Sequence, residues 1–479
     1  MRKLFGAVIT TLALSACEPA PPPESKAVPS LASSKELVVL VRNGSTSFYV
    51  DQEGKYAGLE YDLVTRFAEE IGVKVRFEVV PRYDEIFPKL AAHEAHLAVG
   101  VLKREAPGIS YGPDYQPVQP VLVYHAENDP PKTLTDAIGQ DKLVMVAAQH
   151  VPAIGKQLPR GVHPNWHADD HHDTEELVEK VAQGLIDYAV VDAHGAKVAK
   201  HYYPDVDIAM EIGKPQSLAW AITHEEGLQK KVNTFFDKVR KDGTLSRLLD
   251  RYYGHSNRLQ QVDAAEFLSR RLTILPKYRH LFIEAGEKYG IDWRMLAALG
   301  YQESHWDPYA TSPFGVRGIM MLTTNTADLL GVDDRLDPKQ SIMGGAKYLA
   351  KLKELIPARI AEPDRTWLAF ASYNIGSAHL EDARILAARL KRNPDSWTDL
   401  KATLPLLRNA EYFSTLKYGY ARGGETVIFV ENLRSYYDIL ARFEPPAYTM
   451  FPPFNERVSV ANPEGVRLSI DAPTAAPAH

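Results

Sequence analysis

Glu303 is the residue of this sequence best placed for acid chemistry. It follows Leu296, Leu299 and Gly300 by seven, four and three positions, so its carboxyl ends a helical stripe that should face the core. Burial raises the pKa of a carboxyl because it disfavours the charged form. An acid still protonated near neutral pH can donate to a leaving-group oxygen, as glycosidic cleavage requires. A buried Glu that merely ends its helix is the equally open alternative.

Three further motifs follow Glu303-Ser304 along the chain. They are Gly318-Ile319-Met320-Met321-Leu322, Ala371-Ser372-Tyr373-Asn374, and Glu425-Thr426 with Tyr436 downstream. In this order and spacing they resemble the transglycosylase domain of soluble lytic murein transglycosylases, a family with the mainly helical goose-type lysozyme fold. Four ordered motifs are a far more specific signal than one Glu-Ser pair. The resemblance implies a mainly α, lysozyme-like catalytic domain.

The resemblance also implies a substrate and a role for each motif. The substrate would be the glycan strand of peptidoglycan, and Glu303 would be the sole catalytic acid and base. The residues expected to line the sugar groove are Ser304, Gly318, Met320, Met321, Tyr373, Asn374 and Tyr436. Many family members carry Gln at the position of Met321, so one polar contact with the sugar is expected to be missing here.

A single acid constrains the mechanism. Ordinary glycosidases use two carboxylates, and the nearest second acid, Asp307, precedes Pro308, which biases it away from the helix and the Glu303 face. In the mechanism implied by the resemblance, the N-acetyl group of muramic acid assists departure, and its C6 hydroxyl closes a 1,6-anhydro ring. Glu303 would donate a proton first and accept one afterwards. Hydrolysis by water, as in goose-type lysozymes, stays open, and so does the choice between exolytic and endolytic cleavage.

The first residues predict export and a lipid anchor. The apolar run from Leu4 to Leu14 is too short to span a bilayer and is typical of a signal-peptide core. It leads into Leu14-Ser15-Ala16-Cys17, the lipobox pattern of bacterial lipoproteins, which holds the only cysteine of the 479 residues. Removal of residues 1–16 and lipidation of Cys17 would anchor the protein to a membrane. Glu18 in the next position favours the periplasmic face of the outer membrane.

An α/β domain is predicted between an N-terminal linker and the catalytic domain. Residues 17–34 are rich in Pro, Ala and Ser, which predicts an extended linker. In residues 35–255, apolar strand candidates alternate with amphipathic helix candidates, as in sheets covered by helices. The expected strands are 37–41, 73–80, 143–148 and 188–191, and the expected helices are 59–71 and 174–185.

Residues 35–255 also resemble periplasmic solute-binding proteins of the amino-acid-binding kind. The matching segments are Gly58–Leu63, Gly184–Asp192 and Asp242–Gly254. The resemblance implies a two-lobed fold that binds a small amino acid or muropeptide ligand, with Arg104 on its carboxylate and Asp192 on its amine. A degenerate cleft that only scaffolds the protein is the alternative.

Histidines and aspartates gather between His163 and Asp173, which suggests a metal site. The acid-rich turn leads directly into Thr174-Glu175-Glu176, however, and this is typical of a capped helix start with acids in its first turn. We therefore expect no metal and no cofactor.

The remaining segments complete a multidomain prediction. Residues 256–270 are expected to be a short junction with a helical pattern, residues 271–443 the catalytic domain, and residues 444–479 a Pro-rich extended tail. The net charge of -6 includes no basic run suited to nucleic acid. A lipid-anchored solute receptor whose C-terminal domain only docks on peptidoglycan is the alternative from another functional class.

Overall fold

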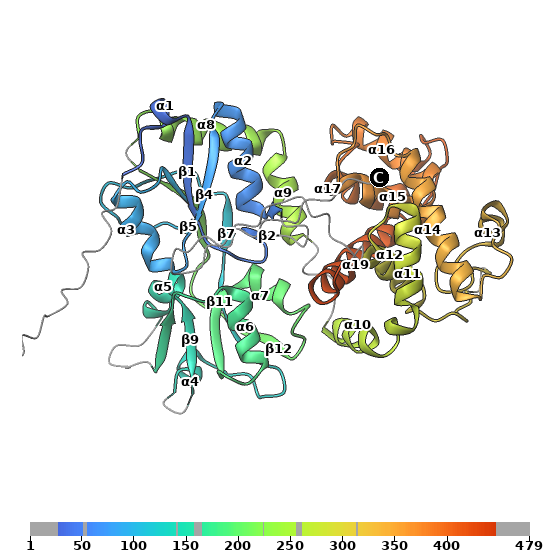
Figure 1. Ribbon diagram of the computed structural model, residues 1–479, viewed down its shortest axis with the longest axis horizontal. Coiled ribbons are helices and arrows are strands. Elements are labelled where there is room, and N and C mark those ends of the chain that lie inside the picture. Colours follow the sequence, from blue (N-terminus) through green and yellow to red (C-terminus); the bar gives the residue numbers. More distant parts are fainter. Residues whose placement is uncertain are drawn as a thin grey trace, which may run out of the picture. The chain divides into compact units, whose positions relative to one another are not determined.

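The computed structural model describes residues 27–50, 55–139, 142–157, 165–223, 225–254, 261–312 and 315–446 (Figure 1). Cys17, the expected signal peptide and most of the expected tail lie outside these residues. The chain divides into two compact units, with the boundary between Ala265 and Glu266. Helix α10 (Gln261–Thr273) crosses this boundary, in the region where a helical junction is expected.

The first unit has two lobes, each built on one sheet (Figure 1). The first sheet has the order β4-β1-β5-β13-β6, with β7 also paired to β13, and the second has the order β10-β9-β11-β8-β12. The strands of the first sheet are β1 (Glu36–Val41), β4 (Lys74–Val79), β5 (Leu97–Leu102), β6 (Ser110–Tyr111), β7 (Gln116–Val118) and β13 (Gln216–Ile222). Those of the second are β8 (Pro120–His125), β9 (Val144–Ala147), β10 (Trp166–Asp169), β11 (Tyr188–Asp192) and β12 (Val206–Glu211). A small ladder joins β2 (Tyr49–Val50) to β3 (Tyr56–Ala57).

Helices cover both faces of each sheet, which is why the central strands are apolar along their whole length. In β1, Val39 packs with α2, α8 and α9, whereas its neighbour Val38 packs with α3 on the opposite face. In the second lobe, α6 and α7 cover one face, and α4 and α5 the other. These helices are α2 (Leu59–Ile71), α3 (Ile86–Ala91), α4 (Leu134–Ala137), α5 (Val151–Gly155), α6 (Thr174–Ala182), α7 (Ala193–Ala199), α8 (Leu228–Lys241) and α9 (Thr244–Tyr253).

The predicted elements of the first unit are present with small shifts at their ends. Strands β1, β4, β9 and β11 fall where strands are expected, and α2 has the predicted bounds. Helix α6 ends at Ala182 rather than Leu185, because the backbone of Gly184 takes a left-handed φ of 67°. Residues Leu31–Ser34 form helix α1, so the expected extended linker is wrong there. Leu31 is buried, and its N–H donates to Glu225 Oε1 at 2.9 Å.

The second unit is helical and is built around α12. This helix packs against α11, α14 and α19, so nearly all of its residues from Trp293 to Tyr301 are buried. The helices that follow α10 are α11 (Leu275–Tyr289), α12 (Trp293–Ser304), α13 (Thr324–Leu330), α14 (Pro338–Leu355), α15 (Asp364–Ile375), α16 (Ser377–Arg389), α17 (Trp397–Lys401), α18 (Ala410–Phe413) and α19 (Gly423–Phe443).

The first residues of the expected tail are packed onto this unit. Glu444 forms ion pairs with Arg271 at 3.0 Å and Arg279 at 2.6 Å. The indole nitrogen of Trp293 donates to the Pro445 carbonyl at 3.2 Å. Residues 444–445 are therefore part of the folded unit rather than of an extended tail.

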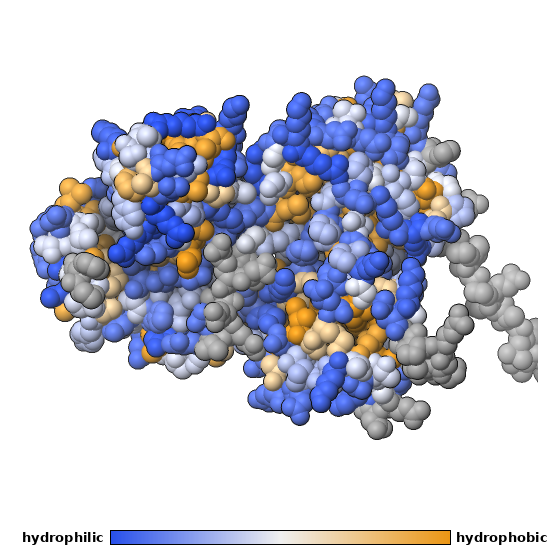
Figure 2. Space-filling view, turned by 180° about the vertical axis from the view of Figure 1, so that it is seen from behind, coloured by the Kyte–Doolittle hydropathy of each residue, from blue (hydrophilic) through white to orange (hydrophobic). Residues whose placement is uncertain are grey.

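The surface has the mixed character usual for folded domains. Figure 2 shows hydrophilic side chains over most of the visible face, with small hydrophobic patches between them. Within the part of the chain that is described, no helix is both long and apolar enough to cross a membrane.

Candidate active site

Helix α12 carries Glu303 in its last turn. Asp292 begins the helix by accepting a hydrogen bond from the Arg294 N–H at 2.9 Å. His305 and Trp306 end it, with positive φ angles of 54° and 60°. The indole nitrogen of the buried Trp306 donates to the Ala297 carbonyl at 2.8 Å, so the chain folds back onto α12 directly after Glu303.

Glu303 is an acid whose burial is not offset by a partner. Its side chain is partly buried, and its carboxyl has no hydrogen bond or ion pair among the residues that the structure describes. Burial alone raises its pKa to about 8, because the charged form loses hydration that nothing replaces. At pH 7 the carboxyl is therefore mainly protonated and able to donate a proton.

The loop between α12 and α13 is held together by Arg335 and shaped by glycine. The Arg335 guanidinium donates to the carbonyls of Gly315 and Leu322 at 2.8 and 2.9 Å. Gly318 has a φ of 80°, and a Cβ at this position would lie 1.8 Å from the Arg335 carbonyl oxygen. Only glycine lets the two backbone segments approach this closely.

Polar side chains from three helices fix the backbone of this loop beside Glu303. The Ser304 hydroxyl lies within hydrogen-bond distance of the carbonyls of Gly300 and Ile319, at 3.1 and 2.9 Å. The Met320 N–H donates to Ser341 Oγ at 3.2 Å, and its carbonyl accepts from the Tyr373 hydroxyl at 2.8 Å. Ser304 thus connects the acid-bearing helix to the loop.

Tyr373 and Asn374 lie in the last turn of α15, which contacts this loop through the Tyr373 hydroxyl. Burial raises the pKa of Tyr373 well above its usual value, and the negative charge of Glu303 raises it further. Asn374 is exposed, and its Oδ1 accepts from the Thr426 hydroxyl at 2.8 Å, which joins α15 to α19. The motif residues Glu303, Ser304, Met320 and Tyr373 are thus gathered at one site.

Two expected groove residues are more deeply buried than a contact with sugar requires. The Met320 side chain is fully buried against Gly300 and Gly345, so only its backbone is part of the site. Tyr436 is 5% exposed, with its ring 4.6 Å from Phe267 in an aromatic cluster. This burial favours a packing role for Tyr436 over the sugar contact that the resemblance implies. Met321 is partly exposed, at a φ of 45°.

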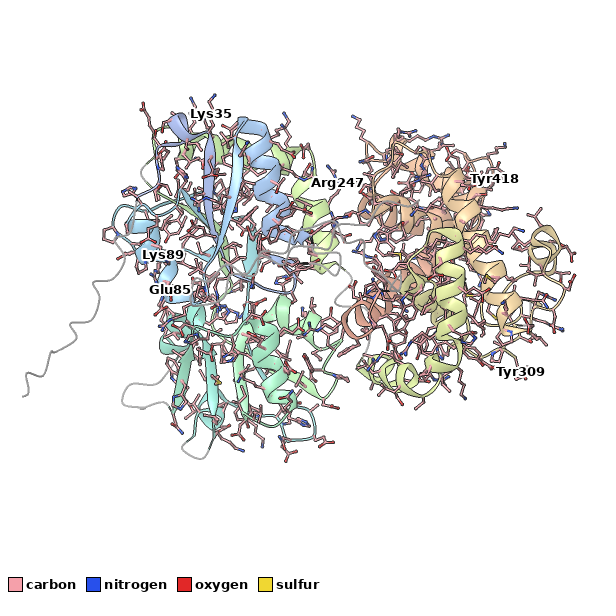
Figure 3. All side chains as sticks on the ribbon, viewed as in Figure 1. Lys35, Glu85, Lys89, Arg247, Tyr309 and Tyr418 are labelled. Atoms are coloured by element: carbon pink, nitrogen blue, oxygen red, sulfur yellow. The ribbon has the colours of Figure 1, made fainter. Side chains whose placement is uncertain are left out.

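Asp307 is turned toward its own backbone. Its carboxylate accepts from the Tyr309 N–H at 2.9 Å, and the Tyr309 side chain projects from the surface of the unit (Figure 3) with 76% of its area exposed. A carboxylate that holds an exposed turn is poorly placed to be a second catalytic acid, as its position before Pro308 also predicts.

Tyr348 of α14 is a further residue near the site that was not predicted. Its ring centroid lies 5.2 Å from that of Tyr373, so it borders the same site. No sequence pattern singles it out, because its helix reaches the site through Gly345, where a Cβ would lie 2.7 Å from Met320 side-chain atoms. Residues three apart share a helix face, so Tyr348 follows directly on the contact between α14 and the loop.

Family models match both units of the chain. Residues 280–395 match the model described as transglycosylase SLT domain, and residues 37–255 match bacterial extracellular solute-binding proteins, family 3. The expected fold class, a two-lobed α/β domain followed by a mainly α lysozyme-like domain, is thereby confirmed.

Two curated relatives cover almost the whole chain. The membrane-bound lytic murein transglycosylase F of Methylobacillus flagellatus is 44% identical over 471 residues, 97% of this chain and 98% of the relative. That of Nitrosospira multiformis is 47% identical over 421 residues, 87% of this chain and 88% of the relative. The chain belongs to the membrane-bound lytic murein transglycosylase F family.

In this member of the family, a cleft between the two lobes of the first unit contains Asp192 but not Arg104. Residues of both lobes line the cleft, among them Arg42, Glu60, His150 and Asp192. Asp192 also caps α7, since its Oδ1 accepts from the Gly195 N–H at 2.7 Å and its Oδ2 from the Thr174 hydroxyl at 2.6 Å.

The expectation for Arg104 is corrected by its position. Its guanidinium lies over the Phe87 ring, 3.6 Å from the centroid, and its side chain is exposed beyond the end of β5. Arg42, one residue past the end of β1, is the arginine that lines the cleft.

The histidine-rich turn is organised around a helix start. Asp169 accepts from His172 Nδ1 at 2.8 Å, and Asp173 and Glu176 form a capping box at the first turn of α6. The predicted capped helix start is confirmed, with Asp173 rather than Thr174 as the cap, while His163 lies outside the described residues.

We expect Gly318→Ala to destabilise the second unit more than Gly315→Ala does. Both glycines have positive φ, 80° and 76°, but a Cβ at Gly315 would meet nothing within 4 Å. The Gly315 variant should lose about 1 kcal/mol from its backbone conformation, and the Gly318 variant at least about 2 kcal/mol more from the clash with Arg335. Thermal unfolding followed by circular dichroism compares the two variants. Equal losses would contradict this account of the loop.

Proposed function

We propose that this chain is a lytic murein transglycosylase that uses Glu303 as its only acid and base. It cleaves the β-1,4 bond between N-acetylmuramic acid and N-acetylglucosamine and releases 1,6-anhydromuropeptides during cell-wall turnover. The observation that carries the proposal is the carboxyl of Glu303, which burial keeps protonated and which has no partner in the described residues. Family membership supports the substrate and the type of reaction.

The chemistry balances without water. Glu303 gives its proton to the glycosidic oxygen as the bond from C1 of the muramic acid to that oxygen breaks, with assistance from the N-acetyl group. The C6 hydroxyl then forms a bond to C1, and its proton passes to the Glu303 carboxylate, which restores the acid. A pKa of about 8 suits both steps, because general acid–base groups work best when their pKa lies near the operating pH.

Glu303→Gln should abolish turnover and preserve the fold, because an amide of nearly the same shape cannot donate the proton. We expect at least a hundredfold loss of anhydromuropeptide release from purified sacculi, measured by liquid chromatography with mass spectrometry. Asp307→Asn is the matched control and should remain active. More than a tenth of wild-type activity in the Gln variant would exclude Glu303 as the acid. If the wild-type protein releases mainly products with reducing muramic acid ends, it is a hydrolysing lysozyme. If the wild type releases no products at all, its C-terminal domain only docks on peptidoglycan.

The pH profile should report the raised pKa of Glu303. The reaction begins from the protonated acid, so kcat/KM should be nearly constant well below pH 8, reach half its maximum near pH 8 and fall about tenfold per pH unit well above it. Rates on soluble glycan strands between pH 5 and pH 10 test this expectation. An alkaline limb centred near pH 4.5, the ordinary value for glutamic acid, would contradict the role of burial.

We also propose that Cys17 carries a lipid that holds the protein at the periplasmic face of the outer membrane. The support is the lipobox that ends at Cys17 and the "membrane-bound" in the names of the relatives. Mass spectrometry of the mature N-terminus would identify the modification.

The cleft of the first unit is proposed to sense an amino-acid or muropeptide ligand. Both ring nitrogens of the buried His150 lack a partner within the described residues, and buried polar groups are normally satisfied by water or a ligand. Burial lowers the pKa of His150 to about 4, so the ring is neutral at pH 7 and available as donor and acceptor. A ligand that favours one lobe arrangement could alter access to Glu303 through α10, which crosses the boundary between the units.

Asp192→Asn tests this sensing role while keeping a residue that can cap α7. The variant should lose at least about tenfold in affinity for muropeptides, because hydrogen bonds to a charged group contribute about 1.5–3 kcal/mol. It should also lose any change of turnover that the muropeptides cause. Calorimetry and rate measurements with and without muropeptide give both values, and Asp237→Asn, with 79% of its side chain exposed, is the control. An unchanged affinity would place the ligand elsewhere.

A further inference from the structure

Most polar side chains around Glu303 are already used to hold the protein together. The hydroxyls of Ser304 and Tyr373 contact loop carbonyls, and the Asn374 side-chain oxygen accepts from Thr426. These contacts fix the walls of the site, so they leave few donors for a bound sugar. A donor without a protein partner at this position is therefore of particular interest.

Tyr348 supplies such a donor. Its side chain is partly buried, and its hydroxyl makes no hydrogen bond among the residues that the structure describes. Burial raises its pKa above the ordinary value for a phenol, so the hydroxyl keeps its proton throughout the pH range in which Glu303 acts. A phenol of this kind is a neutral hydrogen-bond donor with a well-defined position.

The position of Tyr348 follows from the packing of α14. Gly345, one turn earlier, has no side chain, and Met320 occupies that space with several atoms that would lie 2.7 Å from a Cβ. Tyr348 extends the same helix face to Tyr373, with the rings 5.2 Å apart and inclined at 59°. The Tyr373 hydroxyl donates to the Met320 carbonyl, and the hydroxyl of Ser304, the residue after Glu303, contacts the carbonyl of Ile319, the residue before Met320. Tyr373 thus connects Tyr348 to the loop that contacts the Glu303 helix.

We propose that Tyr348 donates a hydrogen bond to an oxygen of the amino sugar bound beside Glu303 and thereby positions the scissile bond. The ligand class is an N-acetylated hexosamine, whose hydroxyl and amide oxygens accept such bonds. This inference rests on the proposed function, since it assigns a substrate contact at the same site. Tyr373 keeps the structural task of holding Met320, and Tyr348 has the substrate-directed one.

Tyr348→Phe tests the assignment, because it removes the hydroxyl and retains the ring. We expect kcat/KM on soluble glycan strands to fall about threefold to tenfold, the effect of one neutral hydrogen bond, with most of the loss in KM. The melting temperature and the alkaline midpoint of the pH profile should stay at wild-type values. Tyr289→Phe is the matched control, since Tyr289 ends α11 beside the start of α12, at the opposite end of that helix from Glu303.

A binding measurement separates this inference from the proposed reaction. Neither Glu303→Gln nor the double variant Glu303→Gln/Tyr348→Phe should cut glycan strands, so their binding can be measured directly. The strands should bind Glu303→Gln several-fold more tightly, because the double variant lacks the tyrosine hydroxyl. Weaker binding by the double variant supports Tyr348 even if the wild type proves not to release anhydro products. Equal binding, a similar loss in Tyr289→Phe, or a shifted melting temperature or pH midpoint in Tyr348→Phe would overturn the assignment.

Discussion

Burial affects both Glu303 and Glu431 of the helical unit, but at neutral pH the Glu303 carboxyl is mainly protonated, whereas that of Glu431 is charged. Burial alone would raise the pKa of Glu431 as it does that of Glu303. Arg434 and Lys401 lie 2.8 and 2.9 Å from the Glu431 oxygens, however, and Trp397 donates at 2.7 Å, so its pKa falls to about 2. The partners of a buried carboxyl, rather than the extent of its burial, decide whether it is charged at neutral pH. The catalytic unit therefore depends on keeping donors away from Glu303 while supplying them to other buried acids.

The loop beside Glu303 shows how donors are kept away. The hydroxyls of Ser304 and Tyr373 are close to the acid, and a hydrogen bond from either to its charged form would lower its pKa. Both contact loop carbonyls instead, at 2.9 and 2.8 Å. The close approach of Gly318 to Arg335 places those carbonyls within reach. Ser304 and Tyr373 thus help to keep the pKa of Glu303 high, because their hydroxyls contact the loop and not the carboxyl.

The predictable features of this chain are those that depend on neighbours in sequence. The apolar stripe that ends at Glu303 and the bounds of α2 follow from helical periodicity. Tyr348 was not predictable in this way, because its proposed role depends on its contact with Tyr373, 25 positions away, and on the contact of its helix with Met320 through Gly345. Arg104 and Arg42 both follow apolar strands, and only the sheet order and the side-chain directions reveal which of them lines the cleft. The groove position of Tyr436 was expected from the family resemblance, and its burial, which depends on contacts with distant residues such as Phe267, favours packing instead.

Desolvation also offers a physical reason why one carboxyl can suffice. In the proposed mechanism, Glu303 becomes a buried carboxylate after it has given its proton to the leaving oxygen. No cation in the described residues contributes to its pKa, so the new charge is poorly stabilised and the carboxylate is a strong base. The C6 hydroxyl of the same sugar is the proton source at hand, and its deprotonation both relieves the charge and closes the anhydro ring. A neighbouring arginine, like the one beside Glu431, would stabilise the carboxylate and remove this drive. The missing partner that makes Glu303 an acid in the first step thus makes it a base in the second.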